Sequence, residues 1–170
     1  LGLVIVDQGR FADSFALFRR HAELAFGGPE AATRGGDPPH KVKHDQEQRD
    51  YLNGDKAGGT TVRFNLEAGD RVSGRAVRAD TSGGDIAARW QTSSPQIAVI
   101  DNLLTDEALE RLRNYCWRST MWYKAYPNGY LGAMPEHGFA CPLLAQIADE
   151  LRSTFPTILG EHPLLRWWGF

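Results

Sequence analysis

The chain has 170 residues, of which 42% are hydrophobic and 24% are charged, a composition typical of a packed globular protein rather than a disordered one. Its 19 basic and 21 acidic side chains give a formal net charge of −2, and no basic stripe predicts binding to nucleic acid. The longest purely apolar stretch, Leu3–Val6, is far too short to cross a bilayer. We therefore expect a cytoplasmic protein that binds neither nucleic acid nor a membrane.

Residues 1–27 predict a helical hairpin. Leu1–Asp7 is apolar without the alternation of a strand, and Gln8–Arg10 is a turn signal. Gly27 begins a Gly-Gly-Pro sequence that ends the second helix. The hydrophobic residues of that helix recur at spacings of four and three, which places them on one face: Phe11, Phe15, Phe18, Ala22 and Ala25.

This hairpin resembles a tetratricopeptide repeat. The resemblance rests on Leu1-Gly2, Gly9-Arg10-Phe11, Ser14, Phe18 and His21. Ser14 and His21 stand where the family usually has alanines, and the closing proline comes late, at Pro29. The resemblance implies a scaffold that binds a protein or peptide partner. An unrelated helical hairpin is the alternative.

Residues 28–85 are rich in Gly, Pro and charged side chains and predict a connector. Val42–Leu52 has the composition of a short helix within it. Residues 68–85 contain little that would pack in a core. An edge strand is indicated where hydrophobic residues alternate with polar ones, at Val62, Phe64 and Leu66.

His40 and His44 lie four residues apart in this connector, with Asp45 adjacent. On one continuous helix this spacing would place both imidazoles on the same face, as in a metal site. Pro39 makes His40 a helix-start residue at best, and no third ligand follows at a suitable spacing. We therefore favour solvated or locally hydrogen-bonded histidines over a metal site.

Residues 86–170 predict the opening elements of an α+β domain. Gln96–Asp101 follows a proline and is rich in β-branched residues, which indicates a buried strand. Thr105 is the expected N-cap of the next helix and precedes an acidic first turn. The expected buried face of that helix is Leu109, Leu112 and Cys116.

Three further elements follow in chain order. The tight turn at Pro127–Gly129 follows an alternating aromatic run, Met121–Tyr126, and the chain returns at Tyr130–Ala133, which predicts a hairpin. Pro142 opens a helix whose apolar face is expected at Leu144, Ile147, Ala148 and Leu151. Leu164–Phe170 predicts an interior strand that ends without the sheet it would join.

Three segments of this region carry a second resemblance, which covers roughly residues 86–170. They are IAVIDNLLTDEALERLRNYC, YLGAMPEHGFACPLLAQIADEL and HPLLRWWGF. They resemble the elements that precede the double-stranded β-helix core of iron(II)/2-oxoglutarate-dependent oxygenases of the prolyl-hydroxylase type. Bacterial proteins with tetratricopeptide repeats ahead of such a domain form a recognisable group. The resemblance implies hydroxylation of an unknown substrate, for which a protein is one candidate.

That family binds iron(II) through a His-x-Asp pair and a distal His, and holds 2-oxoglutarate with a basic residue. His21-Ala22-Glu23 has a His-x-acid spacing, but it lies in the helical repeat rather than on a core strand. By resemblance, the ligands belong after Phe170. We therefore expect an inactive fragment that binds neither iron nor 2-oxoglutarate by itself.

Four residues are candidates for walls of a cosubstrate or substrate pocket, and each has a structural alternative. The candidates are Tyr130, His137, Trp168 and Phe170. The alternative for Tyr130 is packing across strands, and the alternative for His137 is closure of a loop. The alternative for Trp168 and Phe170 is burial in a core.

Other chemistries find no support in the sequence. It contains neither a Gly-x-x-x-x-Gly-Lys-Ser/Thr loop nor a Gly-x-Ser-x-Gly elbow. Cys116 and Cys141 lie in helical patterns, which indicates packed, reduced thiols. The acidic pair Asp149-Glu150 is expected to be solvated. The rivals of the oxygenase are a non-catalytic scaffold and an interaction module with an unrelated α+β fold.

Overall fold

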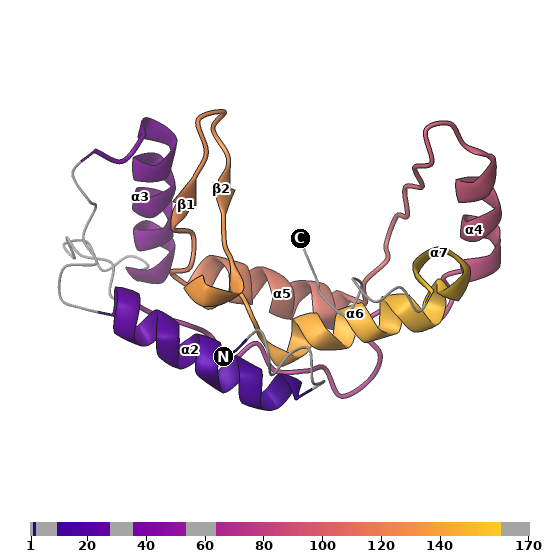
Figure 1. Ribbon diagram of the computed structural model, residues 1–170, viewed down its shortest axis with the longest axis horizontal. Coiled ribbons are helices and arrows are strands. Elements are labelled where there is room, and N and C mark those ends of the chain that lie inside the picture. Colours follow the sequence, from indigo (N-terminus) through magenta and orange to yellow (C-terminus); the bar gives the residue numbers. More distant parts are fainter. Residues whose placement is uncertain (1, 3–9, 28–35, 54–63, 161–170) are drawn as a thin grey trace. The chain divides into compact units, whose positions relative to one another are not determined.

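The computed structural model describes residues 2, 10–27, 36–53 and 64–160. This part of the chain is mostly helical and has a small two-stranded antiparallel sheet, which agrees with the α+β class in outline (Figure 1). The elements are α2 (Phe11–Phe26), α3 (Pro39–Asn53), α4 (Gly83–Thr92), α5 (Asp106–Arg118), β1 (Lys124–Ala125), β2 (Leu131–Gly132), the 3-10 helix η1 (Pro135–His137), α6 (Pro142–Thr154) and α7 (Pro156–Leu159).

The chain forms two compact units, each built from two separate stretches. The first unit comprises Leu1–Ala68 and Arg113–Cys141, and the second comprises Gly69–Leu112 and Pro142–Phe170. The sequence patterns predicted a linear division instead, after residues 27 and 85. The difference arises because residues far apart in sequence pair with one another inside each unit, as Asn65 does with Thr120.

In the first unit, α2 follows the predicted periodicity for most of its length. Phe18 and Ala22 are buried, whereas Ala25 is exposed, against expectation. The helix ends at Gly27 as predicted, where the glycine N–H donates to Glu23 O at 2.9 Å. The helix predicted for Leu1–Asp7 lies outside the described residues except for Gly2.

The predicted helix at Val42–Leu52 is confirmed as α3, and one of its side chains caps the end of α5. Gln48 Nε2 donates to Trp117 O at 3.0 Å and to Ser119 O at 2.9 Å. The predicted edge strand is wrong in its described part, because Phe64 and Leu66 belong to no strand. The stretch 64–67 instead bonds to the residues that follow α5: Thr120 N–H donates to Asn65 O at 2.8 Å.

The predicted hairpin is confirmed, with shorter strands than expected. β1 pairs with β2 in antiparallel register, with Lys124 opposite Gly132 and Ala125 opposite Leu131. Gly129 takes the turn's left-handed position at φ 88°.

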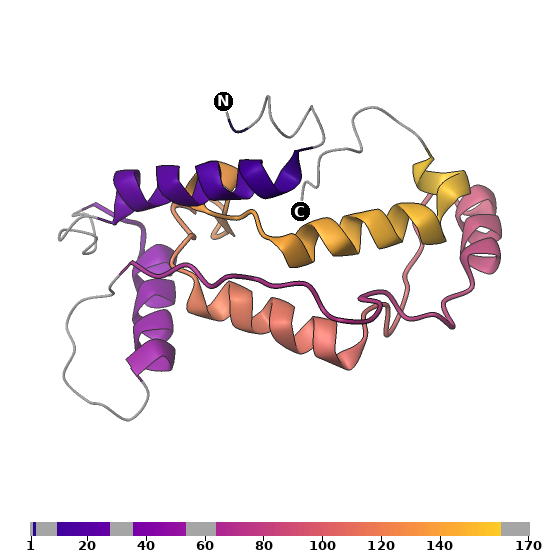
Figure 2. The same ribbon diagram turned by 90° about the horizontal axis from the view of Figure 1, so that it is seen from below.

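In the second unit, an extended stretch packs where little packing was expected. Val72, Ala76 and Val77 are all buried, so residues 68–85 are no simple connector. Val77 forms an isolated antiparallel bridge with Leu104. Figures 1 and 2 show this stretch passing beside α6.

Helix α5 begins as predicted, and its predicted buried face is wrong at Leu109, whereas Leu112 and Cys116 are half-buried. Thr105 Oγ1 accepts the Ala108 N–H at 3.3 Å, as an N-cap should. Ala108 and Tyr115 are buried, whereas Leu109 is 45% exposed. The buried Tyr115 hydroxyl donates to Gly138 O at 2.6 Å and accepts from Ala140 N at 3.2 Å. Because these two hydrogen bonds satisfy the Tyr115 hydroxyl inside the protein, Tyr115 rather than Leu109 lies on the buried face.

The predicted strand at Gln96–Asp101 is wrong. This segment forms no ladder with any described residue, and Ile97 and Val99 are 65% and 72% exposed. Ser93 Oγ accepts the Ile97 N–H at 3.2 Å, so the backbone there bonds locally. β-branched composition alone does not supply the neighbouring strand that a sheet requires.

Helix α6 begins at Pro142 as predicted. Leu144 and Ile147 are buried, and Leu151 is half-buried. The strand predicted for Leu164–Phe170 lies outside the described residues, and the double-stranded β-helix therefore stays a prediction.

Candidate functional site

One face of α6 carries polar side chains that hold the extended stretch of the second unit. Gln146 Oε1 accepts the Val72 N–H at 3.0 Å, and Gln146 Nε2 donates to Gly74 O at 2.8 Å. One turn later, the two carboxylate oxygens of Glu150 accept the N–H groups of Ala76 at 3.1 Å and Val77 at 2.8 Å. Side chains of a helix thus replace the neighbouring strand that would otherwise satisfy this backbone.

Glu150 remains ionised in this setting. Burial raises the pKa of its carboxyl group, but the hydrogen bonds from the Val77 and Ala76 amides, followed by those from Gln146 and the charge of Arg75, outweigh burial and lower it overall. Its side chain is only 17% exposed, so the expectation of a solvated Asp149-Glu150 pair is wrong for Glu150. Local sequence patterns could not reveal this role, because the backbone partners of Glu150 lie more than seventy residues away.

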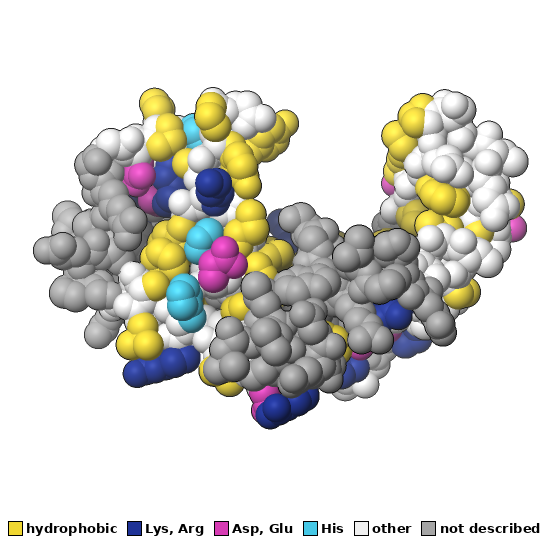
Figure 3. All heavy atoms as spheres, in the orientation of Figure 1, with side chains coloured by type: hydrophobic (Ala, Val, Ile, Leu, Met, Phe, Trp, Pro, Cys, Tyr) yellow, Lys and Arg dark blue, Asp and Glu magenta, His cyan; other side chains and the backbone are white. Residues whose placement is uncertain are grey.

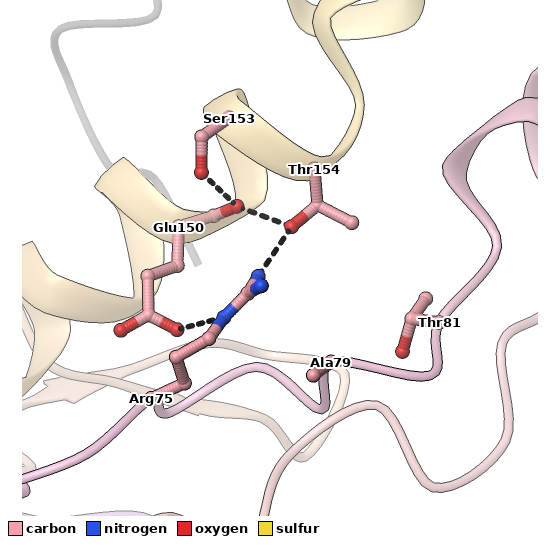
Figure 4. A pocket seen from close by; sticks show the side chains of 6 residues that line it. All are labelled: Arg75, Ala79, Thr81, Glu150, Ser153 and Thr154. Atoms are coloured by element: carbon pink, nitrogen blue, oxygen red, sulfur yellow. Dashed lines mark hydrogen bonds and ion pairs between the residues drawn. The ribbon is translucent and has the colours of Figure 1, made fainter.

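Beside Glu150 lies a polar pocket of about 450 Å³ (Figure 4). Arg75 points from the extended stretch toward α6, where its Nη2 donates to Thr154 Oγ1 at 3.2 Å and its Nε lies 3.8 Å from Glu150 Oε2. The lining residues are Arg75, Ala79, Thr81, Glu150, Ser153 and Thr154. The one signal in the sequence is a polar repeat at i, i+4 and i+8 on the helix: Gln146, Glu150 and Thr154.

The chemistry of this pocket does not support catalysis. The Ser153 hydroxyl donates to the Glu150 carbonyl at 2.9 Å, and no histidine of the described ranges lines the pocket to activate it. Arg75 and Glu150 neutralise each other's charge. The polar groups here stabilise the fold, and the described lining residues leave no acid–base pair at the pocket.

The candidate His137 lies in a separate cluster of rings in the first unit. Phe26, the last residue of α2, stacks on Tyr123 with ring centroids 4.0 Å apart. His137 meets both rings edge-on, with centroids 5.6 Å away in each case. Figure 3 shows histidine and acidic side chains on this part of the surface among hydrophobic ones.

Two histidine side chains form hydrogen bonds at η1: one joins η1 to α2, and the other closes η1 onto its own N-cap. His21 Nδ1 lies 2.9 Å from the carbonyl oxygen of Glu136, and His137 Nδ1 lies 3.2 Å from the backbone nitrogen of Met134. Burial lowers the pKa of His137, and the charges of His21 and Lys124 act in the same direction against that of Glu136. His137 therefore closes a loop, which was its structural alternative.

The other pocket-wall candidates do not join His137 in a described site. Tyr130 lies in the loop of the hairpin, where its side chain is 67% exposed, and it lines no part of the pocket in Figure 4. Trp168 and Phe170 lie outside the described residues. The proposed cosubstrate pocket thus receives no convergent set of side chains from the described ranges.

The described residues do not fit an iron(II) site. No group of three or more His, Cys, Asp or Glu side chains among them could hold a metal ion. Glu23 forms ion pairs with Arg19 at 3.4 Å and Arg20 at 3.5 Å, while His21 bonds to Glu136 O, so this His-x-acid pair does not converge.

The two histidines of α3 also have local surroundings. His44 Nδ1 lies 3.2 Å from Asp45 Oδ1, and its ring meets Trp122 edge-on at 5.9 Å. His40 Nε2 is buried without a hydrogen-bond partner among the described residues. No third ligand from the described ranges joins them.

Comparison with known protein families, with curated proteins and with solved structures finds no match for this chain. Among the helices of the described ranges, none has the length and apolar character needed to cross a membrane. The function is therefore inferred from the residues themselves.

Proposed function

We propose that this chain belongs to a protein in which a tetratricopeptide-like scaffold precedes an iron(II)/2-oxoglutarate-dependent oxygenase domain that hydroxylates a protein or peptide in the cytoplasm. The observation that supports the oxygenase is the order of elements. A Thr-capped α5 and a Pro-initiated α6 begin within segments that resemble the family, and strand β1 of the hairpin lies between those segments.

The packing of α2 supports the scaffold part of the proposal. A Cβ atom added to Gly2 would lie 2.9 Å from Phe18 Cε1, so the chain at residue 2 approaches the Phe18 ring closely. A small residue against a large one on the following helix is typical of repeat units, which pass their apolar faces from neighbour to neighbour. The partner of such a scaffold would be a peptide or protein segment.

The oxygenase chemistry requires residues outside this sequence. The described residues do not fit iron(II), and we assign none of them a role in binding iron or 2-oxoglutarate. In this proposal the metal, when bound by those other residues, supplies the oxidising chemistry. The described residues of this chain would contribute packing and substrate recruitment.

A non-catalytic scaffold is the second candidate, and the exposed apolar side chains favour it. Ile97, Val99 and Tyr130 are each at least 65% exposed, which suits surfaces that associate with other polypeptides. The pocket beside Glu150, with its charges internally paired, adds no catalytic group from the described residues. In this alternative the second domain is oxygenase-like in fold but inactive.

The coding sequence beyond Phe170 separates the two candidates. A His-x-Asp pair followed by a distal His and a basic residue supports the oxygenase. The extended protein should then convert 2-oxoglutarate to succinate only with iron(II), measured by proton NMR, and replacement of the first His by Ala should abolish this. Absence of the triad, or of iron-dependent succinate, would favour the scaffold.

A further inference from the structure

The two histidines between α2 and η1 make hydrogen bonds of opposite polarity. A carbonyl oxygen only accepts, so His21 Nδ1 must carry the proton that it donates to Glu136 O. A backbone N–H only donates, so His137 Nδ1 must be unprotonated to accept from Met134. His137 is therefore a neutral imidazole with its proton on Nε2, whereas the bond of His21 is compatible with either charge state.

Protonation consequently affects the two bonds differently. An imidazolium at His21 still donates to Glu136 O. An imidazolium at His137 places an Nδ1–H against the Met134 N–H, 3.2 Å away at the heavy atoms, and the bond is lost. Because Met134 caps η1, the loss acts directly on the short helix that contacts α2.

The surroundings of His137 disfavour a positive charge. The groups that face it are His21 on α2, Lys124 on β1 and its neighbour Glu136 on η1, and the rings of Phe26 and Tyr123 cover its edge. Two of the three ionisable groups are basic. The half-buried ring and this charge balance lower the pKa of His137, so the proton binds only below the usual range of a histidine.

We propose that His137 is a pH-sensitive latch: its neutral imidazole closes η1 at the Met134 N–H beside the stacked Phe26 and Tyr123 rings, and its protonation opens this closure and loosens the packing of η1 against those rings. The latch has two states because a single proton turns His137 Nδ1 from an acceptor of the Met134 N–H into a second donor that faces it. His21, whose bond survives protonation, keeps the two elements tethered at Glu136.

NMR of the full 170-residue chain between pH 8 and pH 5 tests this proposal. The His137 ring carbons report protonation, and the amides of Met134 and Gly138 report the state of η1, since Gly138 N–H donates to Pro135 O at 2.9 Å. We expect both sets of signals to change with one midpoint below 6.5, and the contacts between the Phe26 and Tyr123 rings to weaken with it. One unit below the midpoint, about 90% of the molecules should be open.

Two variants assign the effect. His137→Asn places a side-chain oxygen, Oδ1, where Nδ1 stands, so it accepts from Met134 without titrating, and the amide transition should disappear while η1 stays closed. His21→Gln removes a neighbouring basic group, so the transition should remain with its midpoint moved upward. The proposal is overturned if the Met134 and Gly138 amides still titrate in His137→Asn. Titration of the wild-type imidazole without any change in those amides would overturn it equally, whether or not the variants fold.

Discussion

Removal of the Glu150 carboxylate should destabilise the second unit by an amount that the structure allows us to estimate. Its two oxygens accept the N–H groups of Ala76 and Val77, and both residues are fully buried, so water cannot replace the lost acceptor. A buried donor left without a partner costs about 1–3 kcal/mol. Glu150→Ala should therefore lower the free energy of unfolding by about 2–5 kcal/mol. Glu150→Gln, which keeps one oxygen, should cost about half as much.

Urea denaturation followed by far-UV circular dichroism measures this effect. With a slope of about 1–3 kcal/mol per molar urea, the alanine variant should shift the midpoint by about 1–3 M. Asp149→Asn is the matched control, because the neighbouring carboxylate is exposed, and it should change stability by less than about 0.5 kcal/mol. If Glu150→Ala is no less stable than Asp149→Asn, the carboxylate does not hold the stretch 71–78 in solution.

Three further results are expected. Gly138→Ala should destabilise the protein by about 1–3 kcal/mol in the same urea assay, because Gly138 has φ 99° and a Cβ there would lie 2.6 Å from a Leu66 methyl group. Gly129→Ala is the control and should destabilise the protein less, because Gly129 has φ 88° but open space around it. Burial raises the pKa of Asp45, but hydrogen bonds from His44 and Lys41 and their charges lower it overall. The ionised Asp45 therefore stabilises the protein fully above its unfolded pKa near 3.8, and this stabilisation is lost as the pH falls through the lower pKa of the folded state. In thermal melts from pH 5 to pH 2, the melting temperature of Asp45→Asn should change less with pH than that of the wild type. The 170-residue chain should bind iron(II) no more tightly than millimolar by calorimetry, and micromolar binding at a defined stoichiometry would contradict our assignment of the histidines.

Helix boundaries were predictable from the sequence because their determinants are local. Thr105, Gly27 and Pro142 act within one turn of their own position, and each marks a helix end or start in the structure. The hairpin at Pro127–Gly129 was predictable for the same reason. In each case the residue that decides the geometry and the backbone group that it serves are close neighbours in the chain.

The Gln96–Asp101 strand failed because a strand depends on a partner that local composition does not name. The prediction that Leu109 belongs to the buried face of α5 was wrong for a related reason. Leu109 fits the periodicity, but the buried Tyr115 hydroxyl pairs with Gly138 and Ala140, more than twenty residues away. The pocket-forming role of Glu150 was equally hidden, since an acidic residue on a helix usually faces water.

The wrong predictions involve groups whose partners lie far away in the sequence, and such long-range hydrogen bonds also hold the described part of the chain together. Where backbone groups lack a partner in a helix or a strand, side-chain amides and carboxylates supply one: Gln48 at the end of α5, and Gln146 and Glu150 along the extended stretch 71–78. Stability should then be more sensitive to these polar side chains than to hydrophobic residues at the surface. Ile97→Ser, at a side chain that is 65% exposed, should cost less than Gln146→Ala, which leaves a buried Val72 amide unpaired. If Ile97→Ser instead costs more than Gln146→Ala, the apolar segment 96–101 is covered in solution. Hydrophobic burial of that segment would then stabilise the protein more than the hydrogen bonds of Gln146 do.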